Sequence, residues 1–368
     1  MICKSGKYSA TAETQQKQDI SAQQKVIGLD SSQEGQMRRR DFGLLVCVAT
    51  CVATVAPSAV FAQATSKQYR VGWLLFPAKD APLSVKYIGD FWEGMRELGY
   101  TEGENIEMLY RFGDFHADRM QPLATELAQL KPDVLVASAT LNAVALKKAT
   151  DRLPIVVAAL ADPIELGLIQ SYSHPGGNVT GIMPYVNGLP TKQLELAREL
   201  IPGATRIGLI DDVTDPKAIP QGREIKAAGD KMRIKIIPAE VRTAADIGGA
   251  YETFSAGNAE VVVVEQSSML VNAAQVIAEA AAAKKLPTLY GYHEHVEAGG
   301  LISYGVNLDW CFRRAAYFVD RILKGAKAAE LPVEFPTTLE LWINRKTANS
   351  LGLKISPDLL VRADNVIE

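Results

Sequence analysis

The chain has 368 residues, of which 48% are hydrophobic and 22% are charged, and its formal net charge is −3 at pH 7. A chain of this length is large for one hydrophobic core and predicts two domains. The slightly acidic balance offers no basic surface of the kind that nucleic-acid binding needs, so we expect no nucleic-acid partner.

An apolar stretch near the start predicts an export signal. In the sequence RRRDFGLLVCVATCVATVAPSAVFAQA, residues 38–64, three arginines precede an apolar core, and small residues follow around Ala62 and Ala64. This order is typical of a signal peptide, which we assign to residues 37–64 with cleavage near Ala62 or Ala64. The alternatives are an uncleaved anchor or a buried helix. The adjacent arginines leave the Sec and the twin-arginine export routes equally open.

Residues 1–36 precede this signal and are rich in Gln, Ser and Lys. A segment with so few apolar side chains predicts disorder. Translation from Met37 would give a signal of ordinary length, so we interpret residues 1–36 as a disordered or wrongly assigned extension.

The chain that remains after cleavage is acidic and has a single thiol. Residues 1–64 contain seven Lys/Arg and five Asp/Glu, which leaves 32 against 37 and a net charge of −5. Cys311 is the one cysteine left, so no intrachain disulfide can form after cleavage. We therefore expect an exported protein that depends on its hydrophobic cores for stability.

From Tyr69 onward, short runs rich in Val, Ile and Leu alternate with longer segments of helical periodicity. This alternation is typical of βαβ units and of a parallel sheet. The strands expected in the first half are 69–76, 105–111, 133–137, 154–159 and 179–183. The helices expected there are 85–99, 117–130, 141–150 and 163–173.

The same alternation restarts at residue 188. The strands expected in the second half are 205–211, 234–238, 260–265, 288–291, 301–306 and 339–343. The helices expected there are 188–200, 216–231, 245–254, 272–284, 293–298, 310–324 and 345–351. Two series of similar length predict an α/β protein with two doubly wound parallel-sheet lobes, joined near residues 181–182 and 303–304.

The common catalytic motifs do not occur in the sequence. It has no dinucleotide fingerprint, P-loop, nucleophile elbow or zincin motif. The HEH sequence at 293–295 has two histidines that point apart on a helix, and no third ligand is evident, so we interpret it as a solvated turn. We expect His116 and His174 to be exposed. The sequence thus predicts no catalytic residue, metal or cofactor.

Polar side chains recur where a strand ends and a helix begins. The candidates of this kind are Ser138, Thr140, Asp162, Gln266, Ser267 and Ser268. In open α/β sheets, ligands bind beyond these strand ends, beside helix N-termini that favour anions. Helix capping explains any one of these residues equally well. Their shared position in both lobes favours a ligand site.

Three aromatic side chains, Phe76, Tyr292 and Tyr304, also lie at strand ends or in the loops of the expected cleft. They are suited to stacking on an apolar or aromatic ligand. Packing inside a core is the alternative role for each of them.

Two long segments carry a family resemblance. They are LPIVVAALADPIELGLIQSYSHPGGNVTGI, residues 153–182, and GGLISYGVNLDWCFRRAAYFVDRILKGAK, residues 299–327. With them, essentially the whole chain resembles the periplasmic substrate-binding proteins of ABC transporters that include tryptophan- and tyrosine-type binders. The resemblance implies a type I periplasmic-binding fold with three crossovers, near Ile182, Ser303 and residues 331–337.

The implied lobes are discontinuous in sequence. The first lobe comprises residues 65–182 plus 304–333, and the second comprises residues 183–303 plus 334–368. The resemblance implies that hinge motion closes them around a ligand.

The resemblance also extends the set of candidate ligand-binding residues. The loop at 138–142, the Asp162 turn, the loop at 266–268 and the crossover at 304–307 match cleft positions of the family, which adds Asn142, Tyr304 and Asn307. Amino-acid-binding relatives often carry an acidic residue where this chain has Asn307. The ligand is therefore either a carboxylate without an amine, or one whose amine pairs with Asp162 or Glu265.

The resemblance implies an exported receptor that delivers a small ligand, an amino acid or a related carboxylate, to an ABC permease and its cytoplasmic ATPase. We expect a monomer. The alternative is a periplasmic sensor of the same fold that docks on a membrane receptor. A third class, an exported hydrolase or isomerase, would need Asp162 and His293 as its acid/base pair.

Overall fold

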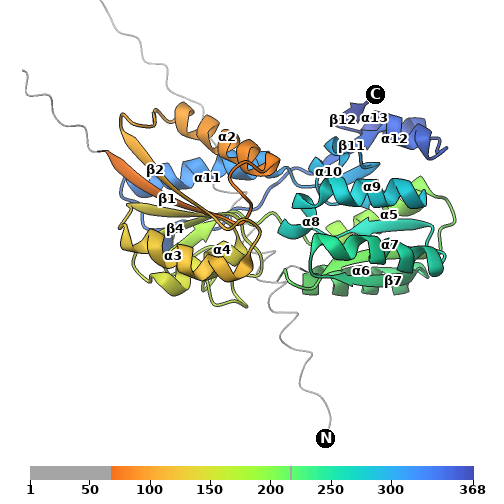
Figure 1. Ribbon diagram of the computed structural model, residues 1–368, viewed down its shortest axis with the longest axis horizontal. Coiled ribbons are helices and arrows are strands. Elements are labelled where there is room, and N and C mark those ends of the chain that lie inside the picture. Colours follow the sequence, from red (N-terminus) through yellow and green to blue (C-terminus); the bar gives the residue numbers. More distant parts are fainter. Residues whose placement is uncertain (1–67, 216–217) are drawn as a thin grey trace, which may run out of the picture. The chain divides into compact units, whose positions relative to one another are not determined.

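The structure, a computed structural model, describes residues 68–215 and 218–368. The predicted signal peptide and the extension before it lie outside these residues. In the described part of the chain, no helix is both long and apolar enough to cross a membrane. Helices flank two separate sheets, which Figure 1 shows.

The first sheet has five parallel strands in the order β2-β1-β3-β4-β5. Its strands are β1 Tyr69–Leu75, β2 Ile106–Phe112, β3 Val134–Ala139, β4 Ile155–Ala159 and β5 Val179–Gly181. β3 and β4 are apolar along nearly their whole length because helices cover both faces of a parallel sheet.

The second sheet has seven strands in the order β12-β11-β10-β9-β8-β6-β7. Its strands are β6 Arg206–Asp212, β7 Lys235–Val241, β8 Val261–Val264, β9 Thr288–Tyr290, β10 Ile302–Gly305, β11 Glu340–Asn344 and β12 Asn365–Ile367. β11 runs antiparallel to β10. The prediction of doubly wound lobes is confirmed, whereas the second sheet is mixed rather than wholly parallel. β12 was not predicted.

The helices mostly follow the expected pattern. They are α2 Pro82–Glu97, α3 Met120–Gln129, α4 Thr140–Ala149, α5 Leu189–Leu200, α6 Ala218–Met232, α7 Ile247–Ala256, α8 Ser268–Asn272, α9 Ala274–Lys284, α10 Glu294–Glu297, α11 Leu308–Leu323, α12 Arg345–Ser350 and α13 Pro357–Arg362. The single helix expected at 272–284 is wrong in extent, because a separate helix α8 ends at Asn272 and α9 begins at Ala274. α13 was not predicted.

The helix expected at 163–173 is wrong. The segment folds into successive turns, in which the N–H of Leu168 donates to the carbonyl of Pro163 at 2.8 Å. Asp162 and Gly167 both have positive φ, 42° and 65°, so the backbone leaves the right-handed helical region on either side of the turn. Pro163 starts a turn here as readily as it would start a helix.

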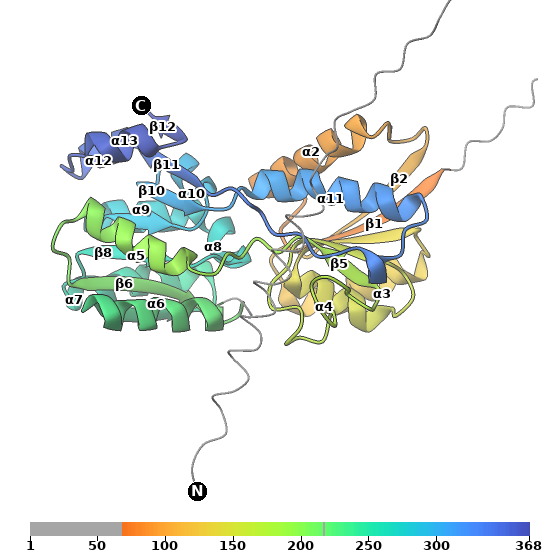
Figure 2. The ribbon, with the colours of Figure 1, turned by 180° about the vertical axis from the view of Figure 1, so that it is seen from behind.

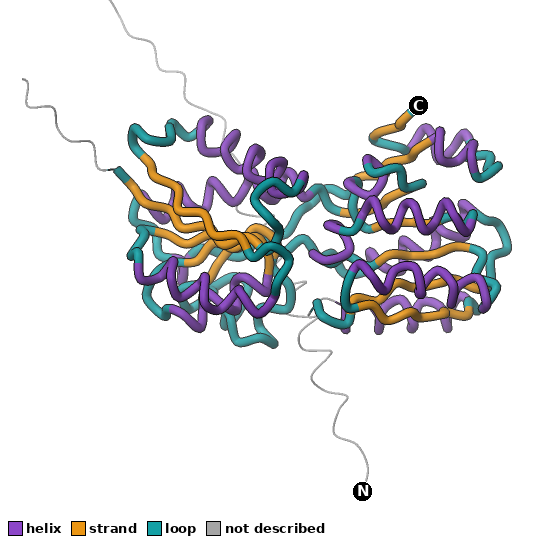
Figure 3. The backbone as a smooth tube through the Cα atoms, viewed as in Figure 1, coloured by secondary structure: helices purple, strands orange, loops and turns teal. Residues whose placement is uncertain are grey.

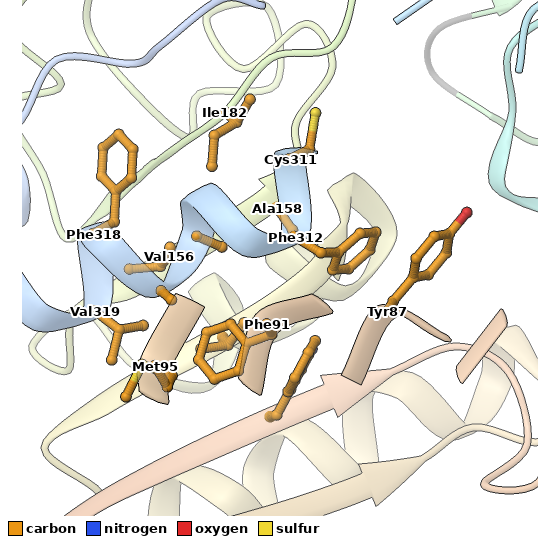
Figure 4. Packing of buried hydrophobic residues seen from close by; sticks show 14 of the residues in the cluster. Tyr87, Phe91, Met95, Val156, Ala158, Ile182, Cys311, Phe312, Phe318 and Val319 are labelled. Atoms are coloured by element: carbon orange, nitrogen blue, oxygen red, sulfur yellow. The ribbon is translucent and has the colours of Figure 1, made fainter. Parts of the chain in front are cut away.

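The long helix α11 returns the chain from the second sheet to the first, where it packs along α2 (Figures 1 and 2). Figure 4 shows the aromatic and aliphatic side chains between them, with Phe91 and Met95 from α2 facing Phe312 and Val319 from α11. This shared core attaches α11 to the first sheet.

The chain crosses between the two sheets three times, through the loops that Figure 3 draws in teal. β10 continues to Gly305, so the second crossing begins two residues after the expected Ser303. The first and third crossings lie side by side: the N–H of Met183 donates to Glu334 at 2.8 Å, and the N–H of Glu334 donates to Gly181 at 3.0 Å.

The contact between α2 and α11 predicts opposite effects for two glycines of one helix. A Cβ at Gly94 would lie 2.5 Å from the carbonyl oxygen of Arg313, whereas a Cβ at Gly89 would meet nothing within 4 Å. We expect Gly94→Ala to lower the free energy of unfolding by about 1–3 kcal/mol through overpacking. Gly89→Ala should raise it by about 0.5–1 kcal/mol through helix propensity. Urea denaturation measures both, and equal effects would contradict the close helix contact.

Candidate functional site

The strand order creates a switch point in each sheet. β1 and β3 are neighbours in the first sheet, and β6 and β8 are neighbours in the second. The connections that leave such neighbours run to opposite sides, so a crevice opens beyond their carboxyl ends, where ligands bind in α/β proteins. Two adjoining cavities lie there, with walls from both sheets.

The first cavity has a volume of about 520 Å³, counted with its open mouth. Its walls are Leu75, Phe76, Pro77, Ser84, Tyr87, Ser138, Ala139, Asn142, Ala159, Ser267, Ser268, Val271, Asn272, Tyr292, Leu308 and Phe312. The rings of Tyr87 and Phe312 stack with centroids 4.0 Å apart and planes 9° apart. None of these described wall residues is charged, so the cavity suits an apolar or aromatic group with a few hydrogen-bonding atoms.

The second cavity, of about 460 Å³, is continuous with the first. The two share five wall residues: Phe76, Ala139, Asn142, Ala159 and Ser268. The second cavity adds Asp212, Thr214 and Asp215 from the end of β6, together with the first residues of α4. The composite cavity is therefore apolar at one end and acidic at the other.

The carboxylates of the acidic end are held by the loop after β6. Oδ1 of Asp212 accepts hydrogen bonds from the backbone N–H of Thr214 at 3.0 Å and from its hydroxyl at 2.6 Å. Oδ2 of Asp212 is buried and accepts no hydrogen bond from the described residues. Asp215 accepts the N–H of Ser268 at 3.2 Å. These bonds fix the loop against the start of α8.

Glu265 at the end of β8 lies behind this end of the cavity and is 1% exposed. Burial, followed by repulsion from Asp211, Asp212 and Asp215, raises the pKa of Glu265 well above its ordinary value. Burial likewise raises the pKa of Asp211, with Glu240 and Asp212 adding to the shift. At the carboxyl ends of β6 and β8, burial and mutual repulsion therefore make these carboxyl groups harder to ionise than they are in water.

The N-terminus of α4 also lines the second cavity. Its N-cap residue, Ala139, has no side chain able to cap the helix, and the hydroxyl of Thr140 accepts the N–H of Ala161 at 2.8 Å. The first-turn N–H groups of a helix have no partner within the helix and carry a partial positive charge. The wall of the second cavity therefore includes both a positive helix end and two carboxylates.

Seven of the eleven predicted site residues line these cavities: Phe76, Ser138, Thr140, Asn142, Ser267, Ser268 and Tyr292. Four line neither cavity: Asp162, Gln266, Tyr304 and Asn307. Asp162 follows β4, and Tyr304 lies within β10; neither strand is at a switch point.

The amides of Gln266 and Asn307 have structural partners. Gln266 donates from Nε2 to the carbonyl of Gly291 at 3.2 Å. Asn307 is the N-cap of α11: its Oδ1 accepts the N–H of Trp310 at 2.9 Å, and its Nδ2 donates to Glu340 at 2.8 Å. The hydroxyl of Ser138 accepts from the indole of Trp73 at 3.2 Å while it borders the cavity.

The interpretation of residues 293–295 as a solvated turn is wrong. His293, Glu294 and His295 are all buried. His293 and Glu294 form a group of three possible metal ligands with Asp309, which is the third ligand that was not evident in the sequence. The ammonium of Lys86 already lies within this group, 2.7 Å from Asp309 and 3.2 Å from Nε2 of His293. A lysine there provides the positive charge that a metal would bring, so we interpret the group as an ion-pair network.

This network reaches the first cavity through Tyr87, whose hydroxyl donates to Glu294 at 3.0 Å. Tyr87 lies on α2 beside the first sheet, whereas Glu294 follows β9 of the second. The hydrogen bond therefore joins a cavity wall residue to the other half of the cleft.

Sequence reasoning missed the acidic end of the cavity and two of its aromatic walls, Tyr87 and Phe312. The signal for the former was present in GLIDDVTD, residues 208–215, where two carboxylates follow a buried strand and a third lies three residues on. Tyr87 and Phe312 lie within helices, and their periodicity is that of ordinary core residues.

A family model described as ABC transporter substrate binding protein matches residues 79–367. The chain belongs to this family. Among its relatives, a tyrosine-binding protein of Clostridioides difficile (strain R20291) is 26% identical over 269 residues, which are 73% of this chain and 77% of that protein.

Two solved structures superpose on most of this substrate-binding protein. The ABC domain from Streptococcus pneumonia in complex with L-Trp has a TM-score of 0.76 and 25% identity, over 82% of this chain and all of that one. A conserved domain protein from Vibrio cholerae has the same TM-score and coverage at 27% identity. The predicted family and fold class are thereby confirmed.

The buried carboxyl of Glu265 predicts a pH-dependent stability. Because its pKa is raised on folding, its contribution to stability is present at low pH and is lost as pH rises through the folded-state pKa. We expect Glu265→Gln to remove this loss. The stability of the variant relative to the wild type should therefore rise by at most about 1.4 kcal/mol per pH unit between the ordinary pKa of a glutamate and the raised folded-state pKa, and level off above it. Thermal melts between pH 5 and 8 measure the difference. The exposed Glu104→Gln is the control, and parallel curves for wild type and Glu265→Gln would contradict the prediction.

Proposed function

We propose that this protein is an exported solute-binding receptor, which closes two lobes around a small ligand and delivers it to an ABC permease with its cytoplasmic ATPase. The observation that carries the proposal is the composite cavity at the two switch points, with walls from both sheets. A ligand bound there contacts both halves of the molecule and stabilises their closed arrangement.

We propose an amino acid or a related carboxylate as the ligand. The named relatives bind tyrosine or hold L-Trp. The aromatic rings of Phe76, Tyr87, Tyr292 and Phe312 suit an aromatic group. The uncapped N-terminus of α4 suits a carboxylate.

The lobes of the proposal are the two sheets with their helices. Because β10 of the second sheet ends at Gly305, we move the second boundary from 303–304 to follow Gly305. The first lobe then comprises residues 68–182 plus 306–333, and the second comprises residues 183–305 plus 334–368. Three crossover segments connect the two lobes, so the lobes can rotate about these segments as a hinge while they stay attached to each other. The signal at 37–64 supports a periplasmic location, and we propose a monomer without cofactor or metal.

A thermal-shift screen of the purified full chain tests the proposal. The compounds are the proteinogenic amino acids and a matched set of aromatic and aliphatic carboxylates without an amine. A ligand at 100 times its dissociation constant adds about 2.7 kcal/mol of stability, which raises the melting temperature measurably. A cooperative melt that no compound of either set shifts would contradict the proposed function.

Substitutions of two adjacent serines should affect ligand binding and stability differently. Ser268 borders both cavities. Ser267 borders only the first, and its hydroxyl caps α8 by accepting the N–H of Leu270 at 3.0 Å. We expect Ser268→Ala to weaken ligand binding by about 0.5–1.5 kcal/mol with little change in melting temperature. Ser267→Ala should lower the free energy of unfolding by about 0.5–2 kcal/mol. Calorimetric titration and thermal melts of both variants check this, and unchanged affinity in Ser268→Ala would remove that residue from the site.

A further inference from the structure

A wall residue of the second cavity has a buried carboxylate oxygen without a hydrogen-bond partner among the described residues. Asp212 lines the second cavity and is 1% exposed, and its Oδ2 accepts no hydrogen bond from the described residues. A buried anionic oxygen that lacks a hydrogen bond costs free energy, so native proteins rarely retain one without a use. The oxygen is held in place because Thr214 fixes Oδ1 of the same carboxylate.

We infer that the ligand carries a protonated amine and that Asp212, with Asp215 beside it, binds this ammonium group. The inference rests on the proposed function and decides between the two ligand classes that it leaves open. Asp212 acts here as a residue that determines specificity.

The charges of the cavity support an ammonium group over a simple anion. Among the described residues that line the two cavities, Asp212 and Asp215 are the charged side chains, and both are acidic. A ligand with a carboxylate alone would bring a further negative charge close to Asp212. An ammonium ion within hydrogen-bonding distance of Oδ2 would instead satisfy the buried oxygen and neutralise charge.

The geometry also accounts for a zwitterion. The N-terminus of α4 and the carboxylates after β6 line the same cavity, so part of its wall is positive and part is negative. An α-amino acid presents a carboxylate and an ammonium on neighbouring atoms. Its side chain would extend into the adjoining aromatic cavity, which shares Ser268 and Asn142 with the acidic one.

This assignment replaces the positions that the sequence suggested for the amine. Asn307 caps α11 and donates to Glu340, away from both cavities. Asp162 and Glu265 line neither cavity. The acidic group for the amine therefore comes from β6, at the switch point of the second sheet.

The first test compares ligands that differ in one group, by calorimetric titration of the full chain. The probes are L-tryptophan, indole-3-propionate and tryptamine, with L-tyrosine, 3-(4-hydroxyphenyl)propionate and tyramine as the second series. We expect the amine-free acids to bind about 10–100-fold more weakly than the amino acids, because a charge-assisted hydrogen bond is lost. An amine-free acid that binds as tightly as its amino acid would overturn the inference and leave the proposed function intact.

The same titrations distinguish failure of the inference from failure of the proposed function. The wider compound sets of the thermal-shift screen extend the comparison beyond these six probes. If the hits in those sets carry an amine, they support the inference. If the hits are amine-free carboxylates, the inference is wrong. If neither set contains a hit, the proposed function fails and the inference fails with it.

The second test removes the charge of Asp212. Asp212→Asn keeps an oxygen for Thr214, and we expect it to weaken binding of the amine-bearing ligand by about 10–100-fold. The same variant should narrow the gap between an amino acid and its amine-free analogue, a change of specificity that simple destabilisation does not produce. Asp230→Asn, which removes an exposed carboxylate of α6, is the matched control and should leave binding unchanged.

A melt without ligand shows whether Asp212→Asn is folded. If the variant is folded and binds the amino acid and its analogue with wild-type affinities, the inference is wrong. If the variant does not fold, the comparison of analogues on the wild-type chain decides the question alone.

Discussion

The order of strands in the two sheets is the constraint on which the rest of this structure depends. Both sheets place their first strand beside their third, β1 beside β3 and β6 beside β8. Connections that leave these neighbours in opposite directions cannot cover the edge between them. Side chains that end these strands therefore meet at one place, and the cavities lie there. Asp162, beyond β4, and Tyr304, within β10, line neither cavity.

The packing of α11 on α2 connects this cleft to the stability of the fold. Tyr87 and Phe312 stack where the two helices meet, and their rings form both the end of a hydrophobic core and a wall of the cavity. The hydroxyl of Tyr87 then donates to Glu294, beyond β9 of the second sheet. One pair of aromatic residues thus takes part in core packing, the cavity wall and a contact between the two halves.

The carboxyl groups near the acidic end of the cavity destabilise the folded state. Glu265 is buried beside three other carboxyl groups, and its pKa is raised as a consequence. A variant with an apolar residue at this position would be at least as stable as the protein with Glu265. A buried carboxyl group with a raised pKa near a ligand cavity is typical of a functional site. At such a site, residues are retained for binding even where they lower the stability of the fold.

The sequence by itself determined the two βα series, the family, most element boundaries and seven residues that line the cavities. Hydrophobic periodicity and capping residues are sufficient to predict these features, because helices and strands depend on residues that are close together in the sequence. Only the tertiary structure decided which strand ends become neighbours, since strand order depends on pairing between distant segments. It therefore decided that Asp212 lies in the cavity and that Asn307 caps a helix. The turns that begin at Pro163 are local, and the sequence failed to separate them from a helix because proline starts both. The tertiary structure also decided that Lys86 and Asp309 enclose His293, because those contacts join parts of the chain far apart in sequence.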